Sequence, residues 1–323
     1  MTPDADYRLA DRGDVRVLTV GGRDYTTRYS ERVVRMLIER KGARRTPPYL
    51  SYKDTRGEHF LGPLFRYLGA RGTRDPSRGT RDLSVLEVGC SFGHMTEYVA
   101  EQPAVKSIVT FDTDPAFVAM TRAKVEELGL KTVRDVSCFG NDDTRRLPYG
   151  DGSFDLVLAV GVVEHLPARN RRAQVDEYYR VLAPGGHIAI LDTPNRAFPF
   201  ETHSVGLPLV QWLPPRLAYR YARACRARRF ADIPFAEFVA DGTGWRNASL
   251  GDCLPSSGWT GLEDVTEDAG YGWRFFHDTA RSRRRRMLLP LFGAACSLAR
   301  AAGVPPSVCL PYFNLLLRKS GGR

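Results

Sequence analysis

The sequence predicts an α/β protein with a doubly wound, mostly parallel β-sheet. Three observations between residues 83 and 195 support this prediction. Apolar runs of strand length recur, amphipathic segments of helix length separate them, and glycine or Asp-Pro stands at several of the boundaries. Because ligands bind at the carboxyl ends of the strands in such sheets, we look for the chemistry there.

The first part of this segment contains two strands and two helices. The run 83–89 (LSVLEVG) is apolar and ends in glycine, as expected for a buried parallel strand. Helical spacing follows at 93–102, and a second strand is predicted at 107–112. The pair Asp114-Pro115 has the residues of a helix N-cap and first turn, and Gly129 marks the end of that helix.

The second part repeats the alternation. Residues 153–163 form an almost continuous apolar strand, and 171–182 form an amphipathic helix. Residues 184–186 (PGG) predict a turn, and 187–193 predict another buried strand.

The first strand leads into a glycine-containing loop, 87–94 (EVGCSFGH). Glycines let a ligand approach the backbone, and the following helix start offers free N–H groups. A dinucleotide fingerprint would need three glycines, but its positions hold Gly89, Ser91 and His94, and no Walker motif is present. The loop therefore favours a ligand without phosphate. Asp112, at the end of the second strand, is placed to accept both hydroxyls of a ribose.

Four motifs in order resemble the class I S-adenosylmethionine-dependent methyltransferases. They are VLEVGCSFGH, VTFDTDP, NDDTRRLPYGDGSFDLVLAVGVVEHLP and YYRVLAPGGHIAILDTPN, which together span about residues 83–195. The pattern is most similar to the small-molecule branch that includes ubiquinone- and menaquinone-type methyltransferases. The resemblance implies a Rossmann-like sheet with an antiparallel last strand, and S-adenosyl-L-methionine as cofactor. Ser91 departs from it, since the family usually has its second glycine there.

The resemblance also implies cofactor-binding residues. The first loop would hold the amino acid end of the cofactor, and Asp112 its ribose. Asp143 would reach the adenine amino group, with Asp142 one residue off register, and Val160 would lie near the sulfonium. The full set is Glu87, Gly89, Cys90, Ser91, Gly93, Asp112, Thr113, Asp142, Asp143 and Val160. Glu87 could instead be a simple strand-end charge, and either of Asp142 and Asp143 could cap a turn.

The resemblance divides the chain into four segments. Residues 1–82, with helices at 24–42 and 57–69 and a linker at 69–82, would form an N-terminal helical lid. The cofactor-binding core is 83–195, and an acceptor-binding insertion follows at 196–260, with a basic helix at 217–230. Residues 261–323 would complete the sheet with strands at 262–267 and 312–319, separated by a basic and apolar helix at 281–303.

Two histidines are candidates for a general base. His165 follows the strand at 153–163, and His203 lies in the insertion with Glu201 two residues away as its orienting partner. Histidine suits deprotonation of a hydroxyl, and we favour His203 because acceptor-specific chemistry usually lies in the variable segment. Glu164, Asp192 and His203 are a further set for Mg²⁺, but they show no recognisable metal spacing, so we predict no metal site.

These features predict methyl transfer to a small-molecule acceptor, most simply a hydroxyl oxygen. Two alternatives stay open: a nucleic-acid methyltransferase, and a cofactor-binding regulatory protein without catalysis. The net charge of +10 favours the first alternative, but the basic residues are dispersed and no nucleic-acid-binding module is recognisable, so we predict no nucleic-acid partner.

The cysteines and the chain start predict a cytoplasmic location. The six cysteines form no CxxC pair, and the first residues lack the pattern of a secretory signal. The arginines at 281–286 precede an apolar helix. This pattern predicts either peripheral contact with an anionic membrane or a helix that covers the fold.

Overall fold

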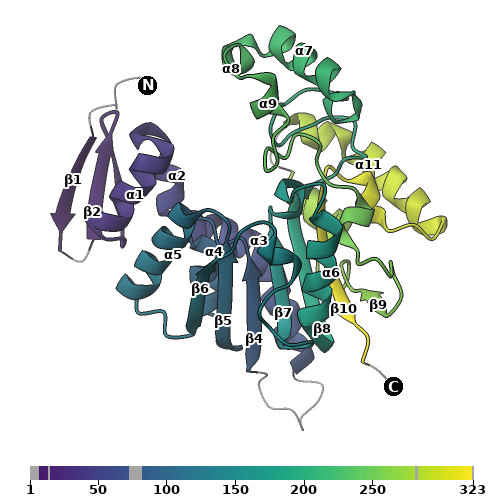
Figure 1. The fold of residues 1–323 in the computed structure, drawn as a ribbon, viewed down its shortest axis with the longest axis horizontal. Helices are drawn as coiled ribbons and strands as arrows, with labels where there is room; N and C mark the ends of the chain where they lie inside the picture. Colours follow the sequence, from purple (N-terminus) through teal and green to yellow (C-terminus); the bar gives the residue numbers. More distant parts are fainter. Residues whose placement is uncertain (1–6, 14, 73–81, 281–282, 322–323) are drawn as a thin grey trace. The chain divides into compact units, whose positions relative to one another are not determined.

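The structure is a computed structural model that describes residues 7–13, 15–72, 82–280 and 283–321. The chain forms two compact units, residues 1–139 and 140–323 (Figure 1). The predicted linker at 69–82 begins inside a helix, and its residues 73–81 lie outside the described residues.

The first unit begins with an antiparallel sheet that sequence analysis did not predict. Strands β1 (Tyr7–Arg12), β2 (Val15–Val20) and β3 (Arg23–Thr27) pair in the order β1-β2-β3. Gly21 and Gly22 have φ angles of 57° and 72°, as a tight hairpin between β2 and β3 requires.

The predicted helix at 24–42 is therefore wrong in its first part. Residues 24–27 belong to β3, where tyrosine and threonine favour a strand. Helix α1 (Glu31–Lys41) begins after Ser30, whose side chain accepts a hydrogen bond from the N–H of Val33. Four further elements continue the segment: η1 (Ala43–Arg45), α2 (Pro47–Leu50), η2 (Lys53–Gly57) and α3 (Glu58–Gly72). Helix α3 confirms the helix predicted at 57–69.

Three parallel strands complete the first unit. They lie in the order β6 (Val133–Cys138), β5 (Val105–Asp112), β4 (Leu83–Val88), with α4 (His94–Ala100) and α5 (Pro115–Glu127) in the connections. The predicted strands at 83–89 and 107–112 and both predicted helices are confirmed. Strand β6 was missed because its sequence, VRDVSC, has no continuous apolar run. Strand β6 lies at the edge of the sheet beside β5 and buries few side chains, so a continuous apolar run is not required.

The second unit holds the remaining strands of the predicted fold. Strands β7 (Phe154–Val160) and β8 (Leu182–Pro194) are parallel, whereas β10 (Tyr312–Lys319) runs antiparallel to both β8 and β9 (Leu262–Asp264). Helix α6 (Arg171–Val181) connects β7 and β8. Residues 184–186, predicted as a turn, lie within the bounds of β8, but its pairing with β7 is irregular there: Leu182 pairs with Phe154, His187 pairs with Leu156, and Gly185 has a φ of 77°. The α/β fold class, with parallel strands and an antiparallel last strand, is confirmed.

The segments around these strands are helical and irregular. The further elements are η3 (Asp143–Arg145), η4 (Val163–His165), η5 (Val210–Trp212), α7 (Pro215–Cys225), α8 (Ala227–Phe230), α9 (Phe235–Phe238), η6 (Leu250–Cys253), α10 (Gly272–Asp278), α11 (Arg283–Ala301) and η7 (Pro306–Cys309). The helix predicted at 217–230 is broken at Arg226, whose backbone is not helical. Among the described residues, no helix has both the length and the apolar composition needed to cross a lipid bilayer.

Candidate functional site

The loop after β4 is held in a conformation that favours glycine. Gly89, Ser91 and Gly93 all have positive φ angles, of 75°, 47° and 69°. For Ser91 this is the left-handed region, which costs energy for a residue with a side chain. The N–H of Ser91 donates to Oδ2 of Asp112 (2.9 Å), and its carbonyl accepts from the hydroxyl of Thr121 (3.2 Å). These two bonds hold the serine where the family usually has glycine.

Gly93 has no room for a side chain. A Cβ at this position would lie 3.0 Å from Oγ1 and 3.2 Å from Cα of Thr121 in helix α5. The loop backbone therefore packs directly on α5, and α4 starts at the next residue. The backbone of the loop at Gly93 is therefore held close to Thr121 of α5.

Asp112, at the end of β5, forms hydrogen bonds with the backbone of this loop and of the residues that follow β5. Its Oδ2 accepts from Ser91, and its Oδ1 accepts from the N–H of Asp114 (3.0 Å). A carboxylate offers about four acceptor positions, so two remain for the hydroxyls of a ribose. The site predicted for a ribose thus fits the group, and Thr113 lies exposed beside it.

Glu87 and Cys90 are both buried. Glu87 accepts a hydrogen bond from the hydroxyl of Thr96, and burial raises the pKa of its carboxyl to about 7. The thiol of Cys90 packs against Val118 and Val136, and burial raises its pKa. The Cys90 N–H donates to the carbonyl of Phe111. Both residues are buried and make their contacts within the fold, and their contact with the cofactor stays a prediction.

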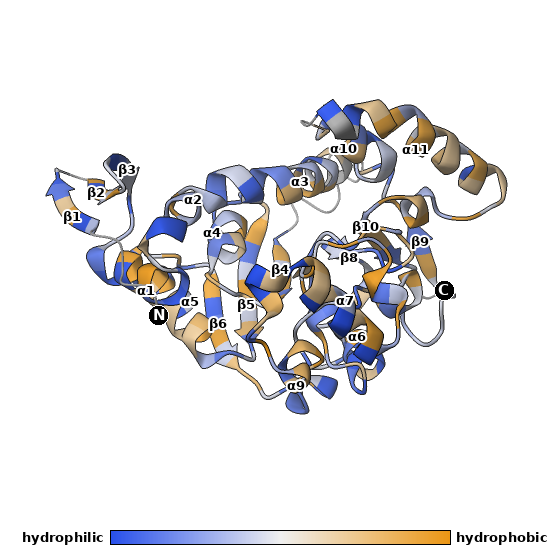
Figure 2. Cartoon of the chain, turned by 90° about the horizontal axis from the view of Figure 1, so that it is seen from above, coloured by the Kyte–Doolittle hydropathy of each residue, from blue (hydrophilic) through white to orange (hydrophobic). Residues whose placement is uncertain are grey.

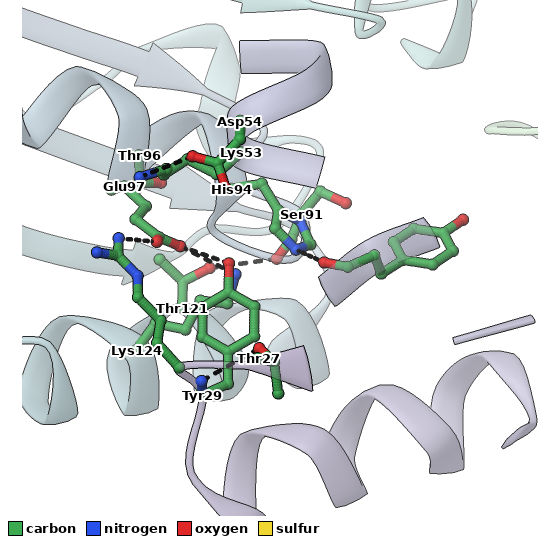
Figure 3. A network of polar contacts seen from close by, with 12 residues as sticks. Thr27, Tyr29, Lys53, Asp54, Ser91, His94, Thr96, Glu97, Thr121 and Lys124 are labelled. Carbon is green, nitrogen blue, oxygen red and sulfur yellow. Dashed lines mark hydrogen bonds and ion pairs between the residues drawn. The ribbon is translucent and has the colours of Figure 1, made fainter. Parts of the chain in front are cut away.

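A buried polar network lies beside the same loop (Figure 3). Glu97 of α4 accepts from the hydroxyl of Tyr29 (2.7 Å), pairs with Nζ of Lys124 (3.3 Å) and also bonds Arg28. Nζ of Lys124 lies 4.0 Å from the centre of the Tyr29 ring. Tyr29 precedes α1, whereas Lys124 belongs to α5, so the network ties the N-terminal segment to the helices that carry the loop. Sequence analysis missed it, and the only signal was a glutamate within the apolar pattern of α4.

In the second unit, Asp142 is the N-cap residue of η3 and Asp143 is its first residue. Oδ2 of Asp143 accepts from the N–H of Gly140 (3.1 Å), and Oδ1 of Asp142 accepts from the side chain of Asn170 (2.7 Å). Both carboxylates thus stabilise the turn, and contact with adenine stays a prediction. Val160 ends β7, and Gly161 follows with a φ of 64° and a hydrogen bond to Leu191.

The two histidines proposed as alternative bases lie together. Nε2 of His203 is 3.1 Å from Nε2 of His165, just after the end of β7. Nδ1 of His165 lies 2.6 Å from the carbonyl oxygen of Gly242. Because a carbonyl only accepts, this nitrogen carries the hydrogen. Burial lowers the pKa of His165, so its ring is neutral and its Nε2 presents a lone pair toward His203.

Gly244 packs against both rings. Its φ is 70°, and an added Cβ would lie 3.1 Å from Cε1 of His165 and 3.1 Å from Cδ2 of His203. The segment 241–244 (DGTG) therefore contributes a carbonyl through Gly242 and close backbone packing through Gly244. Sequence analysis missed both glycines, although two glycines so close together are a signal of a special backbone.

Glu201 positions His203 through the backbone. Its buried carboxylate accepts hydrogen bonds from four consecutive N–H groups, at 2.6 to 2.8 Å. These donors are His203, Ser204, Val205 and Gly206. Glu201 therefore holds the backbone of the loop that carries His203, and its role as orienting partner of a base stays a prediction.

Glu164 lies beside the histidine pair. Its side chain is only 2% exposed, and neither carboxylate oxygen has a hydrogen-bond partner. Oε1 lies 3.8 Å from Nε2 of His165. Burial raises the pKa of this carboxyl to about 8, and the charge of Asp192 raises it further. One ligand atom each from Glu164, His165 and His203 lies within 4.8 Å of the others. The structure thus groups His165, and not Asp192, with Glu164 and His203.

Comparison with known proteins agrees with this architecture. The family described as "Methyltransferase domain" matches residues 86–190. A norajmaline N-methyltransferase of Rauvolfia serpentina is 33% identical over 123 residues, which are 38% of this chain and 39% of that protein. A probable S-adenosylmethionine-dependent methyltransferase of Mycolicibacterium smegmatis is 32% identical over 112 residues, 35% of this chain and 38% of that protein. The tocopherol O-methyltransferase of Arabidopsis thaliana is 31% identical over 126 residues, 39% and 34% of the two chains.

The similarity is confined to the core. The chain spans less than two fifths of the length of each of these three relatives. The relatives transfer methyl groups to nitrogen and to oxygen, so the kind of acceptor does not follow from them, and the quinone-type branch stays a prediction. The matched residues are those in which the sequence shows the four motifs and the structure shows the parallel strands and the glycine loop. Residues 86–190 of this chain therefore match a methyltransferase domain, and they are similar to the core of S-adenosylmethionine-dependent methyltransferases.

Proposed function

We propose that the protein transfers a methyl group from S-adenosyl-L-methionine to a hydroxyl oxygen of a small-molecule acceptor. We further propose that the cluster Glu164–His165–His203 binds this hydroxyl and removes its proton. The observation that carries the proposal is the 3.1 Å approach of the two Nε2 atoms just after the end of β7. The family resemblance expects the sulfonium near the end of that strand, at Val160.

When bound, S-adenosyl-L-methionine supplies an electrophilic methyl group: the acceptor oxygen forms the new C–O bond, and the C–S electron pair returns to sulfur. The residues of the chain orient the acceptor and take up its proton. His165 is held by Gly242 in the tautomer whose Nε2 accepts. His203 is exposed and can meet an acceptor from solvent while its Nε2 hydrogen faces the lone pair of His165.

The pair of His165 and His203 favours a neutral hydroxyl as methyl acceptor over a nucleophile that is already negatively charged. A phenolate needs positioning only, whereas a hydroxyl gains from a neutral histidine within reach. The ring of His165 is partly buried and neutral, whereas the ring of His203 is exposed and accessible to an acceptor. That combination is suited to proton removal near neutral pH.

The first experiment is an acceptor screen with a mass readout of the methylated product. With an acceptor in hand, His203→Ala should lower turnover by about 10²–10⁴-fold, the usual contribution of a general base. Binding of S-adenosyl-L-methionine, measured by calorimetry, should stay near the wild-type value. His277→Ala is the matched control, because His277 is an exposed histidine on α10 outside the cluster.

Two outcomes would contradict the proposal. Methylation confined to amines or thiols would exclude the hydroxyl acceptor. Unchanged turnover in both His203→Ala and His165→Ala would show that the enzyme works by positioning alone.

A further inference from the structure

We propose that Glu164, His165 and His203 bind one divalent transition-metal ion. The proposal deepens the proposed function at the same site, and it rests on that function only for the acceptor that would complete the coordination. It differs from the sequence prediction of no metal site, which considered Asp192 in place of His165.

The distances suit one shared ion. Two donor atoms bound to the same ion at about 2.1 Å, at tetrahedral or octahedral angles, lie about 3.0–3.4 Å apart. The two Nε2 atoms are 3.1 Å apart, and Nε2 of His165 is 3.8 Å from Oε1 of Glu164. Small side-chain rotations bring the third donor into the same range.

Glu164 supplies the independent reason to expect a cation. It is a carboxyl group with 2% exposure and no hydrogen-bond partner on either oxygen. Such burial is costly unless another group compensates it. A cation between Glu164 and the histidines would compensate it directly.

The surroundings of His165 match those of a metal ligand. A ligating histidine typically donates its second ring N–H to a carbonyl or carboxylate, which fixes the ring and its tautomer. Nδ1 of His165 does this with the carbonyl of Gly242 at 2.6 Å. Arg171 holds the same turn by donating to the carbonyls of Glu164 (3.1 Å) and Leu166 (3.0 Å).

The donor set selects the class of ion. Two imidazoles and one carboxylate suit Zn²⁺, Mn²⁺, Co²⁺, Ni²⁺ or Fe²⁺, whereas Mg²⁺ and Ca²⁺ prefer oxygen donors alone. Three protein ligands leave an open position for a water or an acceptor oxygen. A hydroxyl bound there would lose its proton to solvent water more readily than a free one. A histidine that binds the ion through Nε2 carries its hydrogen on Nδ1 and has no lone pair left, so the histidines either bind the ion or act as base.

Cobalt is the probe for this site, because its visible absorption reports on its ligands. Untagged protein, stripped with chelator, should bind one equivalent of Co²⁺ with new absorption bands, and Zn²⁺ should displace it. His165→Ala and His203→Ala should each weaken Co²⁺ binding by at least about 100-fold, and Glu164→Gln should weaken it by at least about 10-fold. His277→Ala should bind Co²⁺ like the wild type. Retained binding of S-adenosyl-L-methionine shows that each variant is folded.

The outcomes separate this inference from the proposed function. No stoichiometric Co²⁺ binding, or full binding in both histidine variants, would overturn the metal site while leaving the histidine pair as base. Co²⁺ binding that depends on the cluster, in a protein that methylates no hydroxyl, would support the metal site and overturn the proposed function. Loss of hydroxyl methylation on chelation and its recovery with Zn²⁺ or Mn²⁺ would support the metal site and the hydroxyl acceptor, and would overturn the histidine pair as base.

A second inference comes from α11, far from this cluster in the sequence. We infer that one face of α11 docks on an anionic membrane surface. Its exposed apolar residues are Met287 (72%), Leu288 (51%), Leu291 (64%) and Leu298 (71%). Leu291 follows Met287 by four residues, and Leu298 follows Leu291 by seven, so these three side chains lie on one face of the helix. Apolar residues gather along α11 in the hydropathy view (Figure 2).

The other face of α11 is already occupied. Leu289, Phe292 and Cys296 pack with Phe276 and Leu310. The exposed residues are therefore not the buried stripe of the helix, and they need another partner. Four large apolar side chains on one helix face are more than the scattered exposed residues of an ordinary surface.

Charge identifies the partner as an anionic lipid surface. The sequence of α11, RRRRMLLPLFGAACSLARA, contains five arginines and no acidic residue. The side chains of Arg283 and Arg286 are exposed at the end of the helix that precedes the apolar face. Apolar side chains that enter the headgroup region, with arginines beside anionic lipids, are the features of an interfacial helix.

Co-sedimentation with vesicles tests this surface. The full chain should bind vesicles of phosphatidylcholine mixed with phosphatidylglycerol, bind pure phosphatidylcholine weakly, and dissociate at high salt. Arg283→Gln with Arg286→Gln should weaken binding by about 30-fold. Leu288→Gln with Leu291→Gln should also weaken it, whereas Leu217→Gln on α7 should not. Leu217 is the matched control because it is as exposed as Leu288, at 51%.

Two results would overturn the membrane surface. Equal binding to neutral and anionic vesicles, or none to either at low salt, would exclude an anionic lipid partner. A dimer in analytical ultracentrifugation that Leu291→Gln dissociates would show that a second copy of the chain covers this face instead.

Discussion

The backbone N–H of Ser91 donates a hydrogen bond to Oδ2 of Asp112, 2.9 Å away. A residue of the glycine loop is thus directly hydrogen-bonded to the acidic residue at the end of the next strand. Asp112 therefore helps to hold Ser91 in the left-handed region, and we predict that its remaining acceptor positions bind a ribose.

We expect Asp112→Ala to weaken binding of S-adenosyl-L-methionine by at least about tenfold. The change removes charged hydrogen bonds worth about 1.5–3 kcal/mol and releases Ser91 as well. Asp112→Asn keeps one oxygen and should lose less. Calorimetry measures both, with Asp82→Ala as control because Asp82 precedes β4 and forms an exposed ion pair with Lys106. A folded Asp112→Ala protein with wild-type affinity would exclude the ribose role.

Gly93→Ala should destabilise the first unit more than Gly129→Ala does. Both glycines have positive φ angles, of 69° and 60°, so alanine pays a similar backbone cost at each. Only at Gly93 would the new Cβ meet Thr121, whereas at Gly129 nothing lies within 4 Å. We expect the difference between the two variants to be about 1–3 kcal/mol in urea unfolding, and cofactor binding to weaken only in Gly93→Ala. Equal effects would show that crowding at Thr121 is unimportant.

Gly244→Ala should lower methyl transfer without changing cofactor affinity. The new Cβ would push against both histidine rings at 3.1 Å, and small displacements of catalytic groups lower rates strongly. Gly258→Ala is the control, since its φ is 63° and nothing lies within 4 Å. We expect a loss of about 10-fold or more in kcat for Gly244→Ala. A normal rate would mean that the ring positions tolerate movement, which would weaken the case for the pair.

Glu87 should make stability fall as pH rises. Its pKa is about 7 in the folded chain against 4.5 for the ordinary carboxyl, so the folded state binds more protons between these values. The contribution is fully present below about pH 4.5 and is lost as pH approaches 7. Glu87→Gln should therefore gain about 3 kcal/mol relative to wild type between pH 4.5 and pH 7.5. Urea unfolding of both proteins at these two pH values measures this gain. A constant difference between them would show that Glu87 titrates normally.

The core of the fold was predictable because its signals are local. Residues adjacent in the sequence form the apolar runs of β4, β5, β7 and β8 and the Asp114 N-cap of α5. These strands and this N-cap were predicted correctly. Asp112 could be predicted to end a strand for the same reason, which makes it a candidate site residue. The edge strand β6 and the N-terminal sheet were missed, because their short alternating segments depend on the strands beside them.

The histidine cluster was decided by the tertiary structure alone. The sequence predicted His165 and His203 as competing bases, 38 residues apart, and the fold places them in contact. Gly242, which sets the tautomer of His165, is 77 residues away from it along the chain. Secondary-structure periodicity reflects contacts between residues three or four apart, or across one strand. It contains no information about which distant loops meet, because that depends on how the strands and helices pack.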